Sequence, residues 1–135
     1  MRCSLVRSTL LAGLVLLGVA ARADTFAEPR AQFQQAMSQL TSATGPVPDD
    51  AEQADSAALR GYVLYPYLQA ARLDRSLRAA GTLVPTTLDT RIAGLLRERD
   101  SEPVSQNLRR SWLASLSARE RWEDFLTFHR DASDG

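Results

Sequence analysis

The acidic residues are the first candidates for chemistry, because two carboxylates can act as general acid and base on a glycosidic bond. A catalytic pair of this kind needs a cleft and apolar surroundings that raise the pKa of one carboxyl. Two groups of acids stand close together in the sequence: Glu98, Asp100 and Glu102, then Glu120, Glu123 and Asp124. Arg residues accompany both groups. Arg119 and Glu123 have i, i+4 spacing, and Arg97 and Glu102 flank a predicted turn. We therefore predict surface ion pairs and no catalytic residue.

His129 is the single histidine and Cys3 is the single cysteine. One His cannot form a two-His metal site, and one Cys excludes a disulfide framework and the cysteine-rich zinc modules. His129 has no Cys near it and no Glu spaced for metal binding, so it is predicted to be a surface residue. The sequence has no glycine-rich phosphate loop and no nucleophile elbow. No metal and no cofactor is predicted.

The tyrosines could contact a carbohydrate, because an aromatic ring can stack on a sugar ring. Tyr62, Tyr65 and Tyr67 lie on either side of Pro66. That spacing favours packing between two helices, and glycan contact stays an open alternative.

Arginine and tryptophan residues are concentrated in particular helices. Arg72, Arg75 and Arg78 could contact an anionic polymer. Their place in the last turns of a predicted helix favours a solvated face that opposes the negative end of the helix dipole. Trp112 and Trp122 are predicted to pack between the last two helices and hold them together.

The composition is that of one globular domain. The chain has 135 residues, with 16 basic residues, all of them Arg, and 16 acidic residues. Hydrophobic residues make up 44% and charged residues 24%, which is too apolar for a disordered chain. The formal net charge of zero argues against a nucleic-acid partner, which would select a basic excess.

Residues 1–23 have the pattern of a secretory signal peptide. Arg2 and Arg7 precede an apolar run that ends at Ala20, and small residues lead to a predicted cut after Ala23. The run is shorter than the roughly 20 residues that a bilayer span needs, so we expect no stable membrane insertion after cleavage. A signal anchor is the alternative. Cys3 precedes the apolar run, so it is not placed as a lipoprotein cysteine.

The remaining residues are predicted to form helices throughout, because apolar residues recur at helical spacing and no segment alternates like a strand. The apolar stripes include Phe33–Met37–Leu40, Leu88–Ile92–Leu95–Leu96 and Val104–Leu108–Trp112–Leu116, with Trp122, Phe125 and Leu126 inward in the last helix. The predicted helices span residues 28–40, 51–60, 65–80, 88–99, 102–116 and 118–129. Ser101 is predicted as an N-cap, 116–118 as a turn and 131–135 as a polar tail. The fold class is predicted as all-α, with short antiparallel helix pairs stacked as part of a right-handed superhelix, an α-solenoid.

Three segments resemble a known family when they are taken in order. They are Leu64-Tyr65-Pro66-Tyr67-Leu68, then Asn107-Leu108-Arg109-Arg110-Ser111-Trp112-Leu113, then Arg121-Trp122-Glu123-Asp124-Phe125-Leu126. This order is similar to the N-terminal superhelical, U-shaped region of the soluble lytic murein transglycosylases, which are periplasmic enzymes. The likeness covers residues 26–130.

The resemblance implies a role in peptidoglycan turnover in the periplasm. In that family a separate lysozyme-like domain cleaves the bond between N-acetylmuramic acid and N-acetylglucosamine and leaves 1,6-anhydro ends. A Glu followed by Ser does this chemistry, and this sequence has no Glu-Ser pair. The expectation is therefore a non-catalytic portion, residues 24–130, of such an enzyme, whose partner is the peptidoglycan glycan strand. The alternative is a free-standing periplasmic helical-repeat module that binds murein glycan or a protein.

Overall fold

All regular secondary structure in the part of the chain that the computed structural model describes, residues 25–133, is α-helical. The predicted all-α class is confirmed, whereas the predicted signal peptide and its cut after Ala23 lie outside the described residues. None of the described helices is both long enough and apolar enough to cross a membrane. The helices are α1 (Ala27–Ser42), α2 (Ala57–Arg60), α3 (Tyr65–Ala80), α4 (Thr86–Glu98), α5 (Pro103–Ala118) and α6 (Trp122–Ser133).

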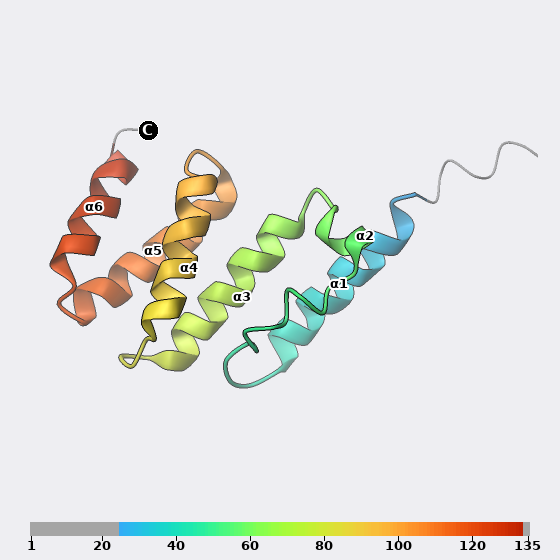
Figure 1. Ribbon diagram of the computed structural model, residues 1–135, viewed down its shortest axis with the longest axis horizontal. Coiled ribbons are helices and arrows are strands. Elements are labelled where there is room, and N and C mark those ends of the chain that lie inside the picture. The colour runs from blue at the N-terminus through green and yellow to red at the C-terminus, as the bar shows by residue number, and fades with distance from the viewer. Residues whose placement is uncertain (1–24, 134–135) are drawn as a thin grey trace, which may run out of the picture.

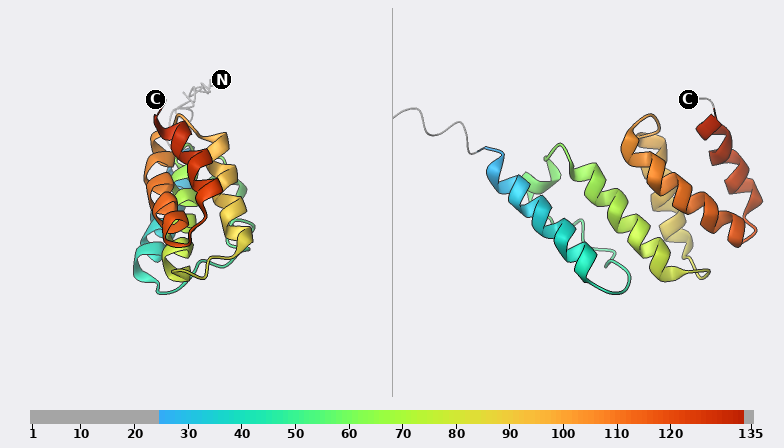
Figure 2. Two further views of the ribbon diagram at one scale, coloured as in Figure 1. Left: turned by 90° about the vertical axis from the view of Figure 1, so that its left-hand side faces the viewer. Right: turned by 180° about the vertical axis from the view of Figure 1, so that it is seen from behind.

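From right to left, Figure 1 shows α1 with α2, then α3, then α4 and α5 crossing in this view, and then α6. α1, α3 and α5 run in one direction, whereas α4 and α6 run in the opposite direction. Viewed from the α6 end, α4 and α5 lie on opposite sides of the stack (Figure 2). α3 is central, because it packs against α1, α4 and α5.

Two apolar clusters hold this arrangement together. The larger one joins α3, α4, α5 and α6 around Ile92, Leu96 and Leu116, none of which has any exposed surface. In the smaller one, Leu59, Tyr65 and Leu68 meet the predicted stripe of α1, which is Phe33, Met37 and Leu40. The stripes predicted for α1, α4 and α5 therefore face the interior, as helical periodicity requires.

α3 has the bounds that its sequence predicts, residues 65–80. Pro66 is tolerated in the first turn, where a backbone N–H would have no helical partner. Gly81 ends the helix with a φ of 57°, a conformation that side chains with a Cβ adopt at a cost. These local signals agree with the packing of α3 against α1, α4 and α5.

The helix predicted over residues 51–60 is wrong for its first half. Residues 43–56, which we call the strap, form a loop with isolated turns, and α2 covers only Ala57–Arg60. Ser56 caps α2, because its Oγ accepts the N–H of Leu59 at 3.0 Å. The strap's acidic side chains bind Arg residues on α3 and α4, and this fixes the backbone in a non-helical course.

The C-terminal boundaries also differ from the prediction. Glu102 occupies the N-cap position of α5 without a side-chain cap bond, so the predicted cap Ser101 is wrong. The turn predicted at 116–118 is the end of α5, and the chain turns instead at Glu120, whose φ is 57°. α6 then continues through Ser133, so most of the predicted polar tail is helical. The sequence around the turn contains no Gly, which is why it was placed too early.

Candidate functional site

The prediction of surface ion pairs is confirmed for part of the acidic clusters, in which three of the six acids are paired. Arg99 binds Glu102 at 3.0 Å, Arg121 binds Asp124 at 2.5 Å, and Arg109 binds Asp100. The Arg99–Glu102 and Arg121–Asp124 pairs are exposed, whereas the side chain of Arg109 is only 9% exposed. Exposed pairs contribute little to stability, and a carboxylate paired with Arg lacks the raised pKa that a general acid needs.

Two of the predicted ion pairs are wrong. Arg119 binds Asp89 on α4 and not Glu123, because the left-handed turn at Glu120 separates α5 from α6. The guanidinium carbon of Arg97 lies 5.2 Å from the ring centre of Phe128, so this residue forms a cation–π contact and no pair with Glu102.

His129 is exposed, as predicted, and its ring stacks on Phe125 with 5.3 Å between ring centres and an interplanar angle of 20°. Within residues 25–133 no three His, Cys, Asp or Glu side chains are grouped so that they could hold a metal ion.

The three tyrosines have three different environments. Tyr65 is buried and Tyr62 packs on Phe33 at 5.6 Å between ring centres, which confirms the predicted packing role for both. Tyr67 instead keeps 43% of its surface exposed. Of the three, Tyr67 is therefore the one whose ring is most available to a ligand.

A buried carboxylate, Asp55, joins the strap to α3. It accepts both terminal nitrogens of Arg72, at 2.5 and 2.9 Å, and the hydroxyl of Tyr65 at 2.8 Å. Burial alone would raise the pKa of Asp55, but hydrogen bonds from Arg72 and Tyr65 outweigh it and hold that pKa below its usual range. Burial and the Asp55 carboxylate raise the pKa of Tyr65 to about 12. The predicted solvated position of Arg72 is therefore wrong.

A second buried carboxylate, Asp89, joins α4 to α5 in a similar way. It accepts both terminal nitrogens of Arg119 and the indole N–H of Trp112, each at 2.8 Å. Burial would raise the pKa of Asp89, but the hydrogen bonds from Arg119 and Trp112 hold it below its usual range. In both clusters the Arg follows the aromatic residue by seven positions, which places the two on one side of a helix.

The two tryptophans differ, although both were predicted to wedge the last helices together. Trp112 does so, since it is buried and meets Phe128 with 4.7 Å between ring centres. Trp122 is 52% exposed, and Leu126, predicted to face inward, is 50% exposed. α6 begins at Trp122, four residues later than predicted, and its inward-facing side is different. Phe128, not Trp122 or Leu126, is the buried residue of this helix.

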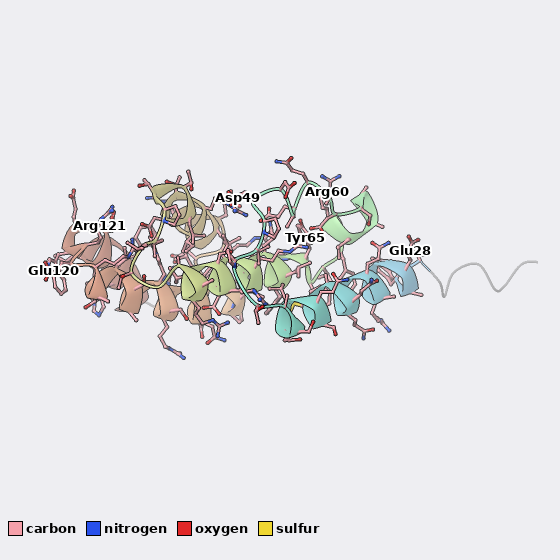
Figure 3. All side chains as sticks on the ribbon, turned by 90° about the horizontal axis from the view of Figure 1, so that it is seen from below. Glu28, Asp49, Arg60, Tyr65, Glu120 and Arg121 are labelled. Carbon is pink, nitrogen blue, oxygen red and sulfur yellow. The ribbon has the colours of Figure 1, made fainter. Side chains whose placement is uncertain are left out.

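The strap is held along its length by side chains of α3 and α4. Arg75 donates to the carbonyls of Leu40, Ala43 and Gly45, so it is tied to the backbone and does not lie on a solvated face. Arg91 binds Asp49 and Glu52 at 3.2 and 3.0 Å. Figure 3 shows Asp49, Arg60 and Tyr65 on one side of the molecule. The strap therefore lies along one side of α3 and binds the side chains of Arg72 and Arg75 there.

Two hollows lie beside α3, between it and its neighbours. A hollow of about 260 Å³ lies where α3 meets α1 and α5, and its lining includes Tyr67, Asp74 and Asn107. A second hollow, about 520 Å³, lies between α1 and α3 and includes Arg78. Met37 and Ala71 line both hollows, so the two are adjacent. We call them together the α3 groove.

Asp74 lines the smaller hollow and has one buried oxygen without a partner. Asp74 binds Arg78 through Oδ2 at 2.5 Å, while its buried Oδ1 has no hydrogen-bond partner among the described residues. A buried oxygen of this kind is uncommon and calls for a donor. Sequence reasoning missed the α3 groove and both buried carboxylates, although the seven-residue aromatic–Arg spacing was visible as a signal. Comparison with known proteins finds no match: no family model, no curated protein and no solved structure matches this chain.

Proposed function

We propose that this chain is a helical scaffold from the superhelical region of a soluble lytic murein transglycosylase, acting in peptidoglycan turnover in the periplasm. The observation that carries the proposal is where the three resembling segments lie. Leu64–Leu68 enters α3, Leu108–Leu113 lies within α5, and Trp122–Leu126 begins α6. The segments thus open or fill three of the helices, α3, α5 and α6, which supports their use in a helical-repeat array.

The proposed scaffold does not cleave glycan itself. Asp55 and Asp89 are the most buried carboxylates of the candidate clusters, and both carry lowered pKa values and bidentate Arg partners. A general acid needs the opposite, a raised pKa next to a substrate cleft. The cleavage of the bond between N-acetylmuramic acid and N-acetylglucosamine is therefore assigned to a Glu-Ser-containing domain of the same protein.

A second candidate is a free-standing periplasmic module that binds murein glycan or a protein. The α3 groove favours this alternative, because a scaffold with its own concave surface can retain a ligand without any further domain.

Two experiments test the proposal. The first reads the gene beyond the codon for Gly135, where a frame that encodes a Glu-Ser motif supports the transglycosylase assignment and unrelated sequence contradicts it. The second expresses the full chain with its own first 23 residues, fractionates the cells, and determines the N-terminus of the exported protein. A periplasmic chain beginning at Asp24 agrees with the proposal, and a cytoplasmic chain beginning at Met1 contradicts it.

A further inference from the structure

A further hollow lies between the strap, α1 and α3. Its volume is about 210 Å³, and its lining includes Ala36 and Leu40 of α1 and Val47 and Ala51 of the strap. The strap leaves the C-terminal end of α1 and turns back to reach α2, so it bounds one side of this space (Figure 1). We call this space the strap hollow.

Polar contacts from α3 fix the walls of the strap hollow. The backbone N–H of Val47 donates to Oγ of Ser76 at 3.2 Å. Arg75 donates to three backbone carbonyls where α1 ends and the strap begins, and the pair of Asp55 with Arg72 holds the other end of the strap. A site whose walls are already held loses less conformational entropy when a ligand binds. The walls of the strap hollow are therefore suited to a ligand before it arrives.

The lining of the strap hollow is mainly apolar. Besides Leu40 and Val47 it includes Pro46 and Pro48, and none of the residues that line it is acidic. Such a lining does not suit a metal ion, which needs oxygen, nitrogen or sulfur ligands. It favours an uncharged molecule, which gains free energy when its apolar surface leaves water.

The two charged residues of the lining, Arg72 and Arg75, restrict the ligand further. Arg72 binds Asp55 with both terminal nitrogens, and Arg75 uses Nε and both terminal nitrogens on carbonyls. Because acceptors already occupy the N–H edge of each group, an anion gains little here. The partly buried Arg75 can still offer its methylene stem and the flat face of its guanidinium to the hollow. Guanidinium faces stack on aromatic rings.

The size of the strap hollow limits the ligand to one or two rings. An apolar cavity of about 150 Å³ is enough to hold benzene. Pockets for drug-sized ligands begin at about 300 Å³. The strap hollow, at about 210 Å³, lies between these sizes. A polymer chain or a folded peptide element is too large to be enclosed by it.

We propose that the strap hollow binds a small, uncharged aromatic molecule of one or two rings, which lies between Leu40, Val47 and the flat face of Arg75. Gln39 also belongs to the lining, and its exposed amide can bind a hydroxyl or a ring N–H that the ligand carries. The proposal goes beyond the murein role and does not depend on it.

Indole tests the proposal on the full purified chain, because it has two flat rings, no charge and one N–H. We expect nuclear magnetic resonance shifts on addition of indole to cluster at Leu40, Val47 and Ala51. Phenol and cyclohexanol have the same number of heavy atoms, but only phenol is flat and aromatic. Phenol should therefore bind about threefold more tightly than cyclohexanol. Benzoate, which adds a negative charge to the ring, should bind no more tightly than phenol.

Two substitutions fill the strap hollow from different sides. Ala51→Leu enlarges a partly buried side chain of the strap, and Ala36→Leu does the same on α1. Each should weaken indole binding at least about tenfold, because the added atoms take the place of the ligand. If thermal unfolding shows that one variant is not folded, the other decides the test.

Each filling substitution has a matched control. Ala54→Leu adds the same atoms to an exposed position of the strap, and Ala31→Leu adds them to an exposed position of α1. Both controls should bind indole as the unchanged chain does.

The outcomes that overturn the proposal are distinct. They are an absence of indole-induced shifts around the strap hollow at millimolar indole, indole binding that survives both filling substitutions, and tighter binding of benzoate than of phenol. Equal affinity for phenol and cyclohexanol overturns the assignment of an aromatic ligand. None of these measurements uses murein, so their failure and the failure of the proposed function are separate results.

Discussion

Asp55 and Arg72 form a two-point ion pair that fixes the strap to α3, with nitrogen–oxygen distances of 2.5 and 2.9 Å. The side chains are only 8% and 10% exposed. Because the pair is out of water, neither charge can be solvated if its partner is lost. This contact is therefore the most buried of the ion pairs that hold the strap.

Asp55→Ala should lower the free energy of unfolding by about 3–5 kcal/mol, since it leaves the Arg72 charge buried and unpaired. Urea denaturation followed by circular dichroism measures the change. Asp49→Ala is the matched control, because Asp49 is 96% exposed in its pair with Arg91, and its effect should stay below about 1 kcal/mol. Equal effects of the two substitutions would contradict the assignment.

Trp112→Phe should cost about 1.5–3 kcal/mol, because it keeps a ring beside Phe128 but removes the N–H that the Asp89 carboxylate accepts. Trp122→Phe should change stability by less than about 0.5 kcal/mol, because that side chain is half exposed. Denaturation midpoints of the two variants under the same conditions give the comparison. A larger loss for Trp122→Phe than for Trp112→Phe would contradict the buried, hydrogen-bonded position of Trp112.

Stability should fall between pH 10 and 12 in a way that depends on Tyr65, whose pKa is raised from 10.0 to about 12. A raised pKa means that the unfolded chain releases this proton first, so the stabilisation is fully present below pH 10 and is lost as the pH rises towards 12. Each pKa unit corresponds to about 1.4 kcal/mol. Urea midpoints across this range should drop less steeply for Tyr65→Phe. An identical slope for both proteins would rule out this coupling.

Glu120→Gly should stabilise the chain by about 1 kcal/mol, because Glu120 has a φ of 57° and left-handed backbone costs a residue with a Cβ roughly that amount. Glu123→Gly provides the opposite control. It lies in the first turn of α6, and Gly should cost about 1 kcal/mol there. Thermal unfolding of the two variants should therefore shift in opposite directions, and a fall in both would show that Glu120 is not strained.

The sequence predicted the parts of the fold that local signals determine. α3 follows from Pro66 at its start, Gly81 at its end and an apolar face between them, and these signals agree with its packing. The stripes of α4 and α5 were found for the same reason. The strap was predicted as half helix because Ala-rich sequence favours a helix locally, while its contacts with Arg72, Arg75 and Arg91 depend on residues far away in the chain.

The candidate site could not be predicted in the same way. Asp55, Asp89 and Arg119 meet their partners across 17, 23 or 30 residues, and an i, i+4 rule does not reach that far. The α3 groove depends on which side of α3 its neighbours leave open, so it becomes visible only when α1 and α5 are in place. Tyr67 looked equivalent to Tyr62 and Tyr65 by spacing, and only the fold distinguishes them.

The strap is a place where extra residues could be inserted into the chain. Its ends are anchored by Arg75 and by the buried Asp55, whereas the side chain of Asp49 near its tip is 96% exposed in its pair with Arg91. Lengthening a surface loop costs little, because closure entropy grows slowly with the number of residues. A reporter peptide or a whole domain inserted after Asp50 should therefore leave both apolar clusters intact, which thermal unfolding of the fusion would check.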